Sequence, residues 1–77
     1  MKLKEIRPKY EKIALIEDRE EEKTSLFPVP QMMAYGLAAE RYGERKVLYM
    51  ADFDDLKQTE ILVESEKQFW KRGKFEN

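Results

Sequence analysis

Three carboxylates follow an apolar run in the stretch VLYMADFDDL, residues 47–56, where they offer the chemistry of a metal site or of acid–base catalysis. Residues two apart on a strand share one face, so Asp52 and Asp54 would repel each other there unless both were exposed. Aspartate is also typical of turns, because its side chain bonds to the nearby backbone. We therefore interpret Asp52, Asp54 and Asp55 as an acidic, solvated strand end that runs into a turn.

The Asp-x-Asp at residues 52–54 resembles the first motif of haloacid-dehalogenase-like phosphatases. In that family the first aspartate is the nucleophile, the second is the acid/base, and both lie at a magnesium site. The resemblance stops after this stretch, and Leu56 stands where the family usually has Thr or Val. A calcium loop starting at Asp52 would need Gly and Glu where Lys57 and Val63 stand. We predict no metal and no cofactor here.

Two absent residue types exclude most other catalytic centres. The sequence contains no Cys and no His, which excludes disulfides, thiol nucleophiles, imidazole bases and the usual zinc sites. The three glycines, Gly36, Gly43 and Gly73, are too far apart to form a phosphate-binding loop. We predict that the protein is not an enzyme.

Length and charge indicate one small, densely charged domain spanning residues 1–77. Charged residues make up 40% of the chain, against roughly 25% in typical domains, but the net charge is only −1. Both ends are basic and the middle is acidic. No apolar run approaches the ~18 residues of a membrane span, and no signal-peptide core is present at the start. We expect a soluble, cytoplasmic protein with no membrane association.

The first half of the sequence predicts a hairpin followed by a helix. Residues 10–18 alternate loosely with apolar side chains on both faces, as in a covered strand, and residues 24–30 could form the return strand. Pro8 interrupts any earlier strand, so residues 1–9 are expected to be a flexible or edge segment. Residues 30–43 predict a helix with Pro30 at its first position and Gly43 just past its end.

The second half predicts another hairpin and a short helix. Residues 44–53 and 58–64 read as two strands joined by a turn. Ser65 and Gln68 have the spacing of a capping box, and Gly73 is placed to end the helix that follows. An alternative remains open, in which residues 55–72 form one helix.

Together these elements predict an α+β fold with two β-hairpins, a central helix and a short C-terminal helix, in the order ββαββα. The side chains that we expect in its core are apolar and belong to these elements. They are Ile13, Leu15, Phe27, Val29, Met33, Leu37, Val47, Tyr49, Ile61, Val63 and Phe69.

The most informative non-catalytic stretch is an aromatic–basic cluster near the C-terminus, consisting of Phe69, Trp70, Lys71, Arg72, Lys74 and Phe75. Such a mixture can anchor a protein interface, or it can stack bases and neutralise phosphates. Met32 and Met33 form a second candidate surface, since methionine suits adaptable binding faces.

From these residues we predict a non-enzymatic protein-interaction module, an adaptor, inhibitor or assembly factor, that binds a protein partner or a second copy of itself. The alternative is a small nucleic-acid-associated protein that uses its basic N- and C-terminal segments. The close of the chain, a short helix followed by Gly73-x-Phe75, resembles small modules of phage and prophage proteins, which implies an origin in a phage or mobile element.

Overall fold

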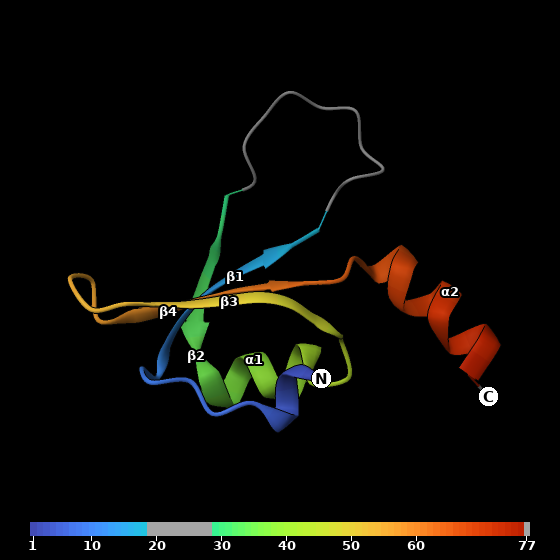
Figure 1. Ribbon diagram of the computed structural model, residues 1–77, viewed down its shortest axis with the longest axis horizontal. Coiled ribbons are helices and arrows are strands. Elements are labelled where there is room, and N and C mark those ends of the chain that lie inside the picture. Colours follow the sequence, from blue (N-terminus) through green and yellow to red (C-terminus); the bar gives the residue numbers. More distant parts are fainter. Residues whose placement is uncertain (19–28, 77) are drawn as a thin grey trace.

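A computed structural model describes the backbone of residues 1–18 and 29–76, and the side chains of these residues up to residue 73 (Figure 1). Its elements confirm the α+β fold in the order ββαββα. A short 3-10 helix precedes the first strand. The elements are η1 (Leu3–Glu5), β1 (Lys12–Glu17), β2 (Gln31–Ala34), α1 (Tyr35–Tyr42), β3 (Val47–Phe53), β4 (Gln58–Val63) and α2 (Glu66–Glu76).

The four strands form one mixed sheet in the order β2-β1-β4-β3. The pairs β1–β2 and β3–β4 are antiparallel, as the two predicted hairpins require. The hairpins meet through a parallel pairing of β1 with β4, in which Ile13 lies opposite Thr59 and Leu15 opposite Ile61. This central parallel pair places the first and the last strand of the chain side by side, which local patterns in the sequence do not indicate.

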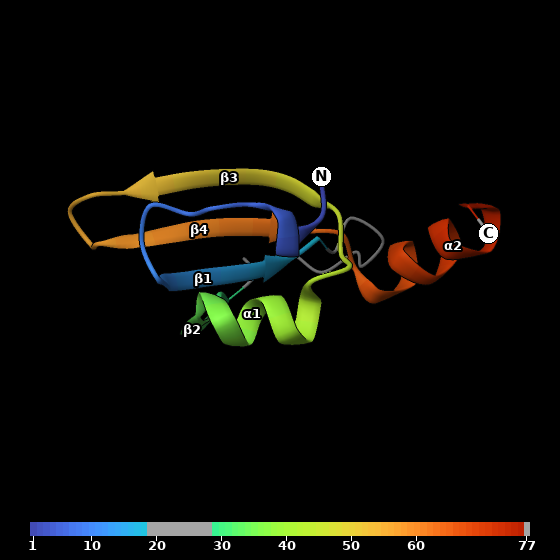
Figure 2. The same cartoon turned by 90° about the horizontal axis from the view of Figure 1, so that it is seen from below.

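The hydrophobic core lies on one face of the sheet. Side chains alternate between faces along a strand, so residues at every second position of β1 and β4 point to the same side. On this side the sheet is covered by α1 and by η1, which lie together below the strands in Figure 1 and can be followed from another direction in Figure 2. The buried apolar residues of this core are Leu3, Ile6, Ile13, Leu15, Ala38, Ile61 and Val63.

The opposite face carries apolar side chains, and no helix of the described residues covers it. We call it the open face and define it by Ile16, Met32, Tyr49, Phe53 and Leu62. Strand register places Ile16, Leu62 and Tyr49 in one row across β1, β4 and β3. Met32, Tyr49 and Phe53 are 48%, 54% and 40% exposed. The same register also places the polar residues Lys12, Gln58 and Glu60 on this face. The described helices therefore cover one side of the sheet, and the other side exposes apolar side chains among these polar ones.

The predicted helix over residues 30–43 begins later than expected. Residues 31–34 form β2 instead, and the helix starts at Tyr35, so Pro30 is not its first residue. The physical reason is pairing: Met32 and Met33 lie opposite residues of β1, and the Tyr35 N–H donates to the Glu11 carbonyl at 2.8 Å. Most of the return strand predicted at residues 24–30 falls outside the described residues. Gly43 follows the last helical residue, as predicted.

At the C-terminal end the structure decides between the two sequence readings. A strand, β4, and a separate helix, α2, occupy residues 58–63 and 66–76, so the single helix over residues 55–72 is wrong. The capping box is confirmed: the Gln68 N–H donates to Ser65 Oγ at 3.1 Å, and the Ser65 N–H to Gln68 Oε1 at 2.9 Å. Gly73 does not end the helix, because a glycine in helical conformation costs only about 1 kcal/mol.

Residues 1–9, expected to be a flexible or edge segment, contribute Leu3 and Ile6 to the core. The Leu3 N–H donates to the Arg45 carbonyl at 3.0 Å, and the Tyr35 hydroxyl donates to the carbonyls of Leu3 and Ile6 at 2.8 and 2.7 Å. Sequence patterns missed these two core residues because they lie outside any regular strand or long helix.

Several expected core residues lie elsewhere. Val29, Tyr49 and Leu37 are 85%, 54% and 38% exposed, so their assignment to the core is wrong. Phe27 lies outside the described residues. Ile13, Leu15, Ile61 and Val63 are confirmed as core, and Met33 and Val47 pack at its margin. Phe69 is half-buried and lies on α2.

Gly43 provides a test of the packing between α1 and the N-terminal segment. A Cβ at this position would overlap the Ala39 carbonyl and come within 3.2 Å of Lys4 Cβ. Gly43→Ala should therefore lower the free energy of unfolding by about 1–3 kcal/mol in urea denaturation, since the overlap must be relieved by backbone movement. Gly36→Ala is the matched control: its Cβ meets nothing within 4 Å, so it should raise stability by up to about 1 kcal/mol. Equal effects of the two changes would contradict this packing.

Candidate functional site

The aromatic–basic cluster divides into an anchored part and an exposed part. Phe69 is half-buried, with the guanidinium carbons of Arg45 and Arg72 at 5.3 and 5.8 Å from its ring centroid. Its ring meets Trp70 edge-on at 5.6 Å, and Trp70 itself is 64% exposed. Lys71 is also exposed. Phe69 thus holds the helix in place, while Trp70 presents an apolar ring to its surroundings. The last two members, Lys74 and Phe75, lie in α2 beyond the described side chains.

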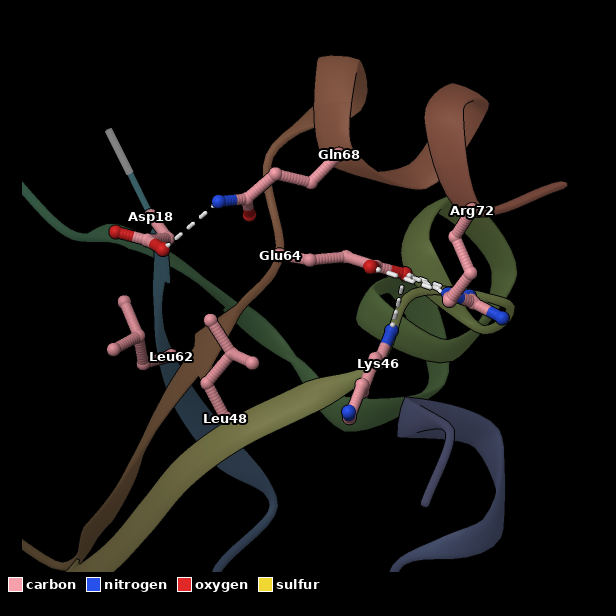
Figure 3. Close-up of a pocket in the computed structure, with 7 residues that line it drawn as sticks. All are labelled: Asp18, Lys46, Leu48, Leu62, Glu64, Gln68 and Arg72. Carbon is pink, nitrogen blue, oxygen red and sulfur yellow. Dashed lines mark hydrogen bonds and ion pairs between the residues drawn. The ribbon is translucent and has the colours of Figure 1, made fainter. Parts of the chain in front are cut away.

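Glu64 is the buried charge that fixes α2 to the sheet. It follows β4 and is only 4% exposed. Its carboxylate accepts from Arg72 Nη2 at 2.6 Å, from Arg72 Nε at 3.1 and 3.2 Å, and from the Lys46 N–H at 2.9 Å (Figure 3). Arg45 Nη1 donates to the Glu64 carbonyl at 3.2 Å. Arg72, which the sequence suggested as a binding residue, therefore makes a structural ion pair.

This environment shifts the pKa of Glu64. Burial opposes ionisation, but the hydrogen bonds from Arg72 and the Lys46 N–H, together with the charges of Arg72 and Arg45, outweigh it. The pKa of the Glu64 carboxyl therefore lies below its ordinary value. The carboxylate is held ionised at neutral pH, which is what a buried partner of an arginine requires.

A cleft of about 510 Å³ separates α2 from the end of the sheet. Figure 3 shows Leu48 and Leu62 on its sheet side, and Gln68 and Arg72 reaching into it from α2. On the far side, Gln68 Nε2 donates to Asp18 Oδ2 at 3.2 Å. Because Leu62 belongs to the open face, the cleft continues that face towards α2.

The structure separates the two methionines that the sequence grouped together. Met33 pairs with Ile13 and packs against the core on the covered side. Met32 pairs with Ala14, points to the other side, and is 48% exposed on the open face. Adjacent residues of a strand point to opposite faces, so only Met32 is placed to contact a partner.

The acidic strand end is a turn, as predicted. Strand β3 ends at Phe53, and the Lys57 N–H donates to the Asp54 carbonyl at 3.3 Å to close the turn. Asp52 accepts a hydrogen bond from Thr59 Oγ1 at 2.6 Å. Asp54 accepts from Lys9 Nζ at 2.8 Å and from the Tyr10 hydroxyl at 2.6 Å, and these donors lower the pKa of its carboxyl. The two carboxylates serve different local partners. Within residues 1–18 and 29–73, no group of three acidic side chains is arranged to hold a metal ion.

Several cations of the basic N-terminal segment are paired with carboxylates. Lys2 Nζ lies 2.9 Å from Glu44, and Lys4 Nζ bonds to the other oxygen of the same carboxylate. The hydrogen bonds from Lys2 and then from Lys4 lower the pKa of Glu44 to about 2. Together with the Lys9–Asp54 pair, these contacts hold three of the cations that the nucleic-acid alternative would use.

Among the described residues, no helix is long and apolar enough to cross a membrane. Comparison with protein-family models, with curated protein sequences and with solved structures found no match to this chain. The site must therefore be judged from its own residues.

The role of Glu64 predicts how stability depends on pH. Because its pKa in the folded protein is below the unfolded value of about 4.3, its contribution is fully present above that pH and is lost as pH falls through the folded pKa. Glu64→Gln should lower the free energy of unfolding at pH 7 by about 2 kcal/mol, less than for a fully buried pair because Arg72 is partly exposed.

Urea denaturation from pH 7 to pH 2 measures this effect. The difference between the native chain and Glu64→Gln should shrink as pH falls below the unfolded value of about 4.3 and through the lowered pKa of the folded protein, where the native carboxylate becomes protonated. The control Glu40→Gln changes an exposed acid on α1 and should alter stability by less than about 0.5 kcal/mol. A Glu64→Gln effect that stays constant across this range would contradict the ion-pair account.

Proposed function

We propose that this chain is a non-enzymatic protein-interaction module that binds its partner through the open face, with Trp70 as a second anchor. The observation that carries the proposal is the sidedness of the sheet: one face is buried under α1 and η1, and the other leaves Met32, Tyr49 and Phe53 at least 40% exposed. Exposed apolar surface of this kind is typical of interaction sites in small proteins.

The residue types on this surface suit a protein partner. Tyrosine, tryptophan, phenylalanine and methionine are enriched in protein interfaces, and Trp70 is among the most exposed large apolar side chains described. The cleft at Leu48 and Leu62 connects the open face with α2, so a partner element lying across the sheet can also reach the helix. An adaptor, inhibitor or assembly factor would use such a surface.

The charges of the described residues favour a protein as the binding partner over a nucleic acid. Binding to a phosphate backbone depends on accessible cations, and here Arg72 is engaged by Glu64 while Lys2, Lys4 and Lys9 are engaged by carboxylates. The net charge of −1 adds no attraction. The non-enzymatic part of the proposal is supported by Asp52 and Asp54, the first candidates for chemistry, since each is hydrogen-bonded within the β3–β4 hairpin or to residues near it.

Affinity capture of the tagged chain from its source lysate, with and without nuclease, tests the proposal. We expect a discrete protein partner that survives nuclease treatment. Met32→Lys places a charge on the open face and Trp70→Ala removes an anchor, so each should weaken partner binding by about 30-fold, corresponding to about 2 kcal/mol. Both residues are exposed, and the variants should fold normally by circular dichroism.

Lys71→Glu is the matched control, because it reverses an exposed charge on the same helix as Trp70. Partner binding should change by less than about threefold, as expected for a charge at the rim of an interface. Loss of all bound material on nuclease treatment, with Lys71→Glu abolishing capture and Trp70→Ala silent, would contradict the proposal and favour the nucleic-acid alternative.

A further inference from the structure

Strand β3 is an edge of the sheet with unusual properties. Figure 2 shows it along the upper margin, with β4 as its neighbour on one side. Its sequence VLYMADF contains no lysine and no proline, residues that natural proteins commonly use to prevent edge pairing. Its one charged residue, Asp52, is hydrogen-bonded to Thr59 of the neighbouring strand β4. Tyr49 on the open face is 54% exposed, and Met50 on the other face is 40% exposed. An apolar edge strand with side chains accessible on both faces is a template for another strand.

The N-terminal segment limits where such a strand can pair. The Leu3 N–H donates to the Arg45 carbonyl, and the Val47 N–H donates to the Met1 carbonyl at 2.9 Å. The backbones of Lys2 and Lys46 thus form an isolated antiparallel β-bridge. These contacts occupy the edge at residues 45–47. Among the described residues, nothing pairs with the outer edge of β3 over residues 48–53. The pairing of β3 with β4 is irregular between Val47 and Tyr49 and regular from Tyr49 to Phe53.

We propose that a second copy of this chain pairs with this edge, so that two β3 strands run antiparallel about a two-fold axis at Ala51 and the two sheets become one. This inference rests on the proposed function as a protein-binding module and adds a second copy as a partner that binds at the β3 edge, apart from the open face. In the proposed register Tyr49 of each copy lies opposite Phe53 of the other, on the open face, with the small Ala51 side chains at the centre.

The aromatic side chains favour a second copy in this register. Cross-strand aromatic pairs stabilise antiparallel sheets, and a symmetric arrangement forms the Tyr49–Phe53 pair twice. On the covered side Met50 would face Asp52, whose carboxylate already accepts from Thr59.

The pairing leaves the open face available. An edge-to-edge contact extends the sheet sideways, so Met32, Ile16 and Leu62 keep their position on the open face of each copy. The dimer would therefore present two open faces in one continuous surface, which would strengthen binding to a repetitive or symmetric protein partner through avidity.

Sedimentation equilibrium over a range of concentrations measures the self-association. The native chain should reach twice its mass of 9.3 kDa. Ala51→Lys sets two like charges against each other at the axis and should raise the dimer dissociation constant at least about tenfold. Ala34→Lys, an exposed alanine on the same face of the opposite edge strand, β2, should leave the dimer unchanged. A native chain that stays monomeric, or a dimer lost in Ala34→Lys and kept in Ala51→Lys, would overturn the inference.

The absence of native cysteine allows a direct test of the register. Only a residue on a two-fold axis meets its own copy, so Ala51→Cys should form a disulfide-linked dimer under mild oxidation. Tyr49→Cys alone should not, but a mixture of Tyr49→Cys and Phe53→Cys should cross-link. Preferential self-linking of Tyr49→Cys would overturn the register. A monomeric chain that still captures a partner through Met32 would refute this inference and leave the proposed function standing.

Discussion

The rest of the structure depends on the parallel pairing of β1 with β4. This pairing joins two antiparallel hairpins into one sheet and brings Ile13 and Leu15 beside Ile61 on a single face. Because these side chains are almost completely buried, the elements that cover them, α1 and η1, are both placed on that side. In the part of the chain that the structure describes, no helix covers the other face.

A second constraint sets the position of α2. The helix leaves the sheet directly after Glu64, whose buried carboxylate needs a cation, and Arg72 supplies it two turns along the helix. The same arginine lies against the ring of Phe69, and Gln68 reaches Asp18 from the capping box. These contacts attach the first half of α2 to the sheet, which directs Trp70 outward and opens the cleft beside Leu62. A structural ion pair thus determines which members of the aromatic–basic cluster remain accessible.

Local patterns in the sequence predicted the structural features that are determined by residues close together in the chain. The two hairpins, the capping box at Ser65 and the turn after Phe53 each follow from side chains a few positions apart. The parallel β1–β4 pair could not be predicted in this way, because it joins residues more than forty positions apart. The role of Arg72 could not be predicted either: its partner Glu64 is only eight positions away, but the sequence does not show that this glutamate is buried. The burial of Leu3 depends on contacts with residues more than thirty positions away. The alternation of Met32 and Met33 between faces required knowing that residues 31–34 form a strand.

The sidedness of the sheet is the central claim, and solvent accessibility of methyl groups tests it most directly. A soluble gadolinium chelate relaxes the NMR signals of methyl groups that it can approach. We expect it to broaden the methyl signals of Met32 and Ile16 strongly and to leave those of Ile13 and Ile61 unchanged. Equal protection of Ile16, Met32 and Ile13 would contradict the account, because it would mean that the face described as open is covered in the isolated protein.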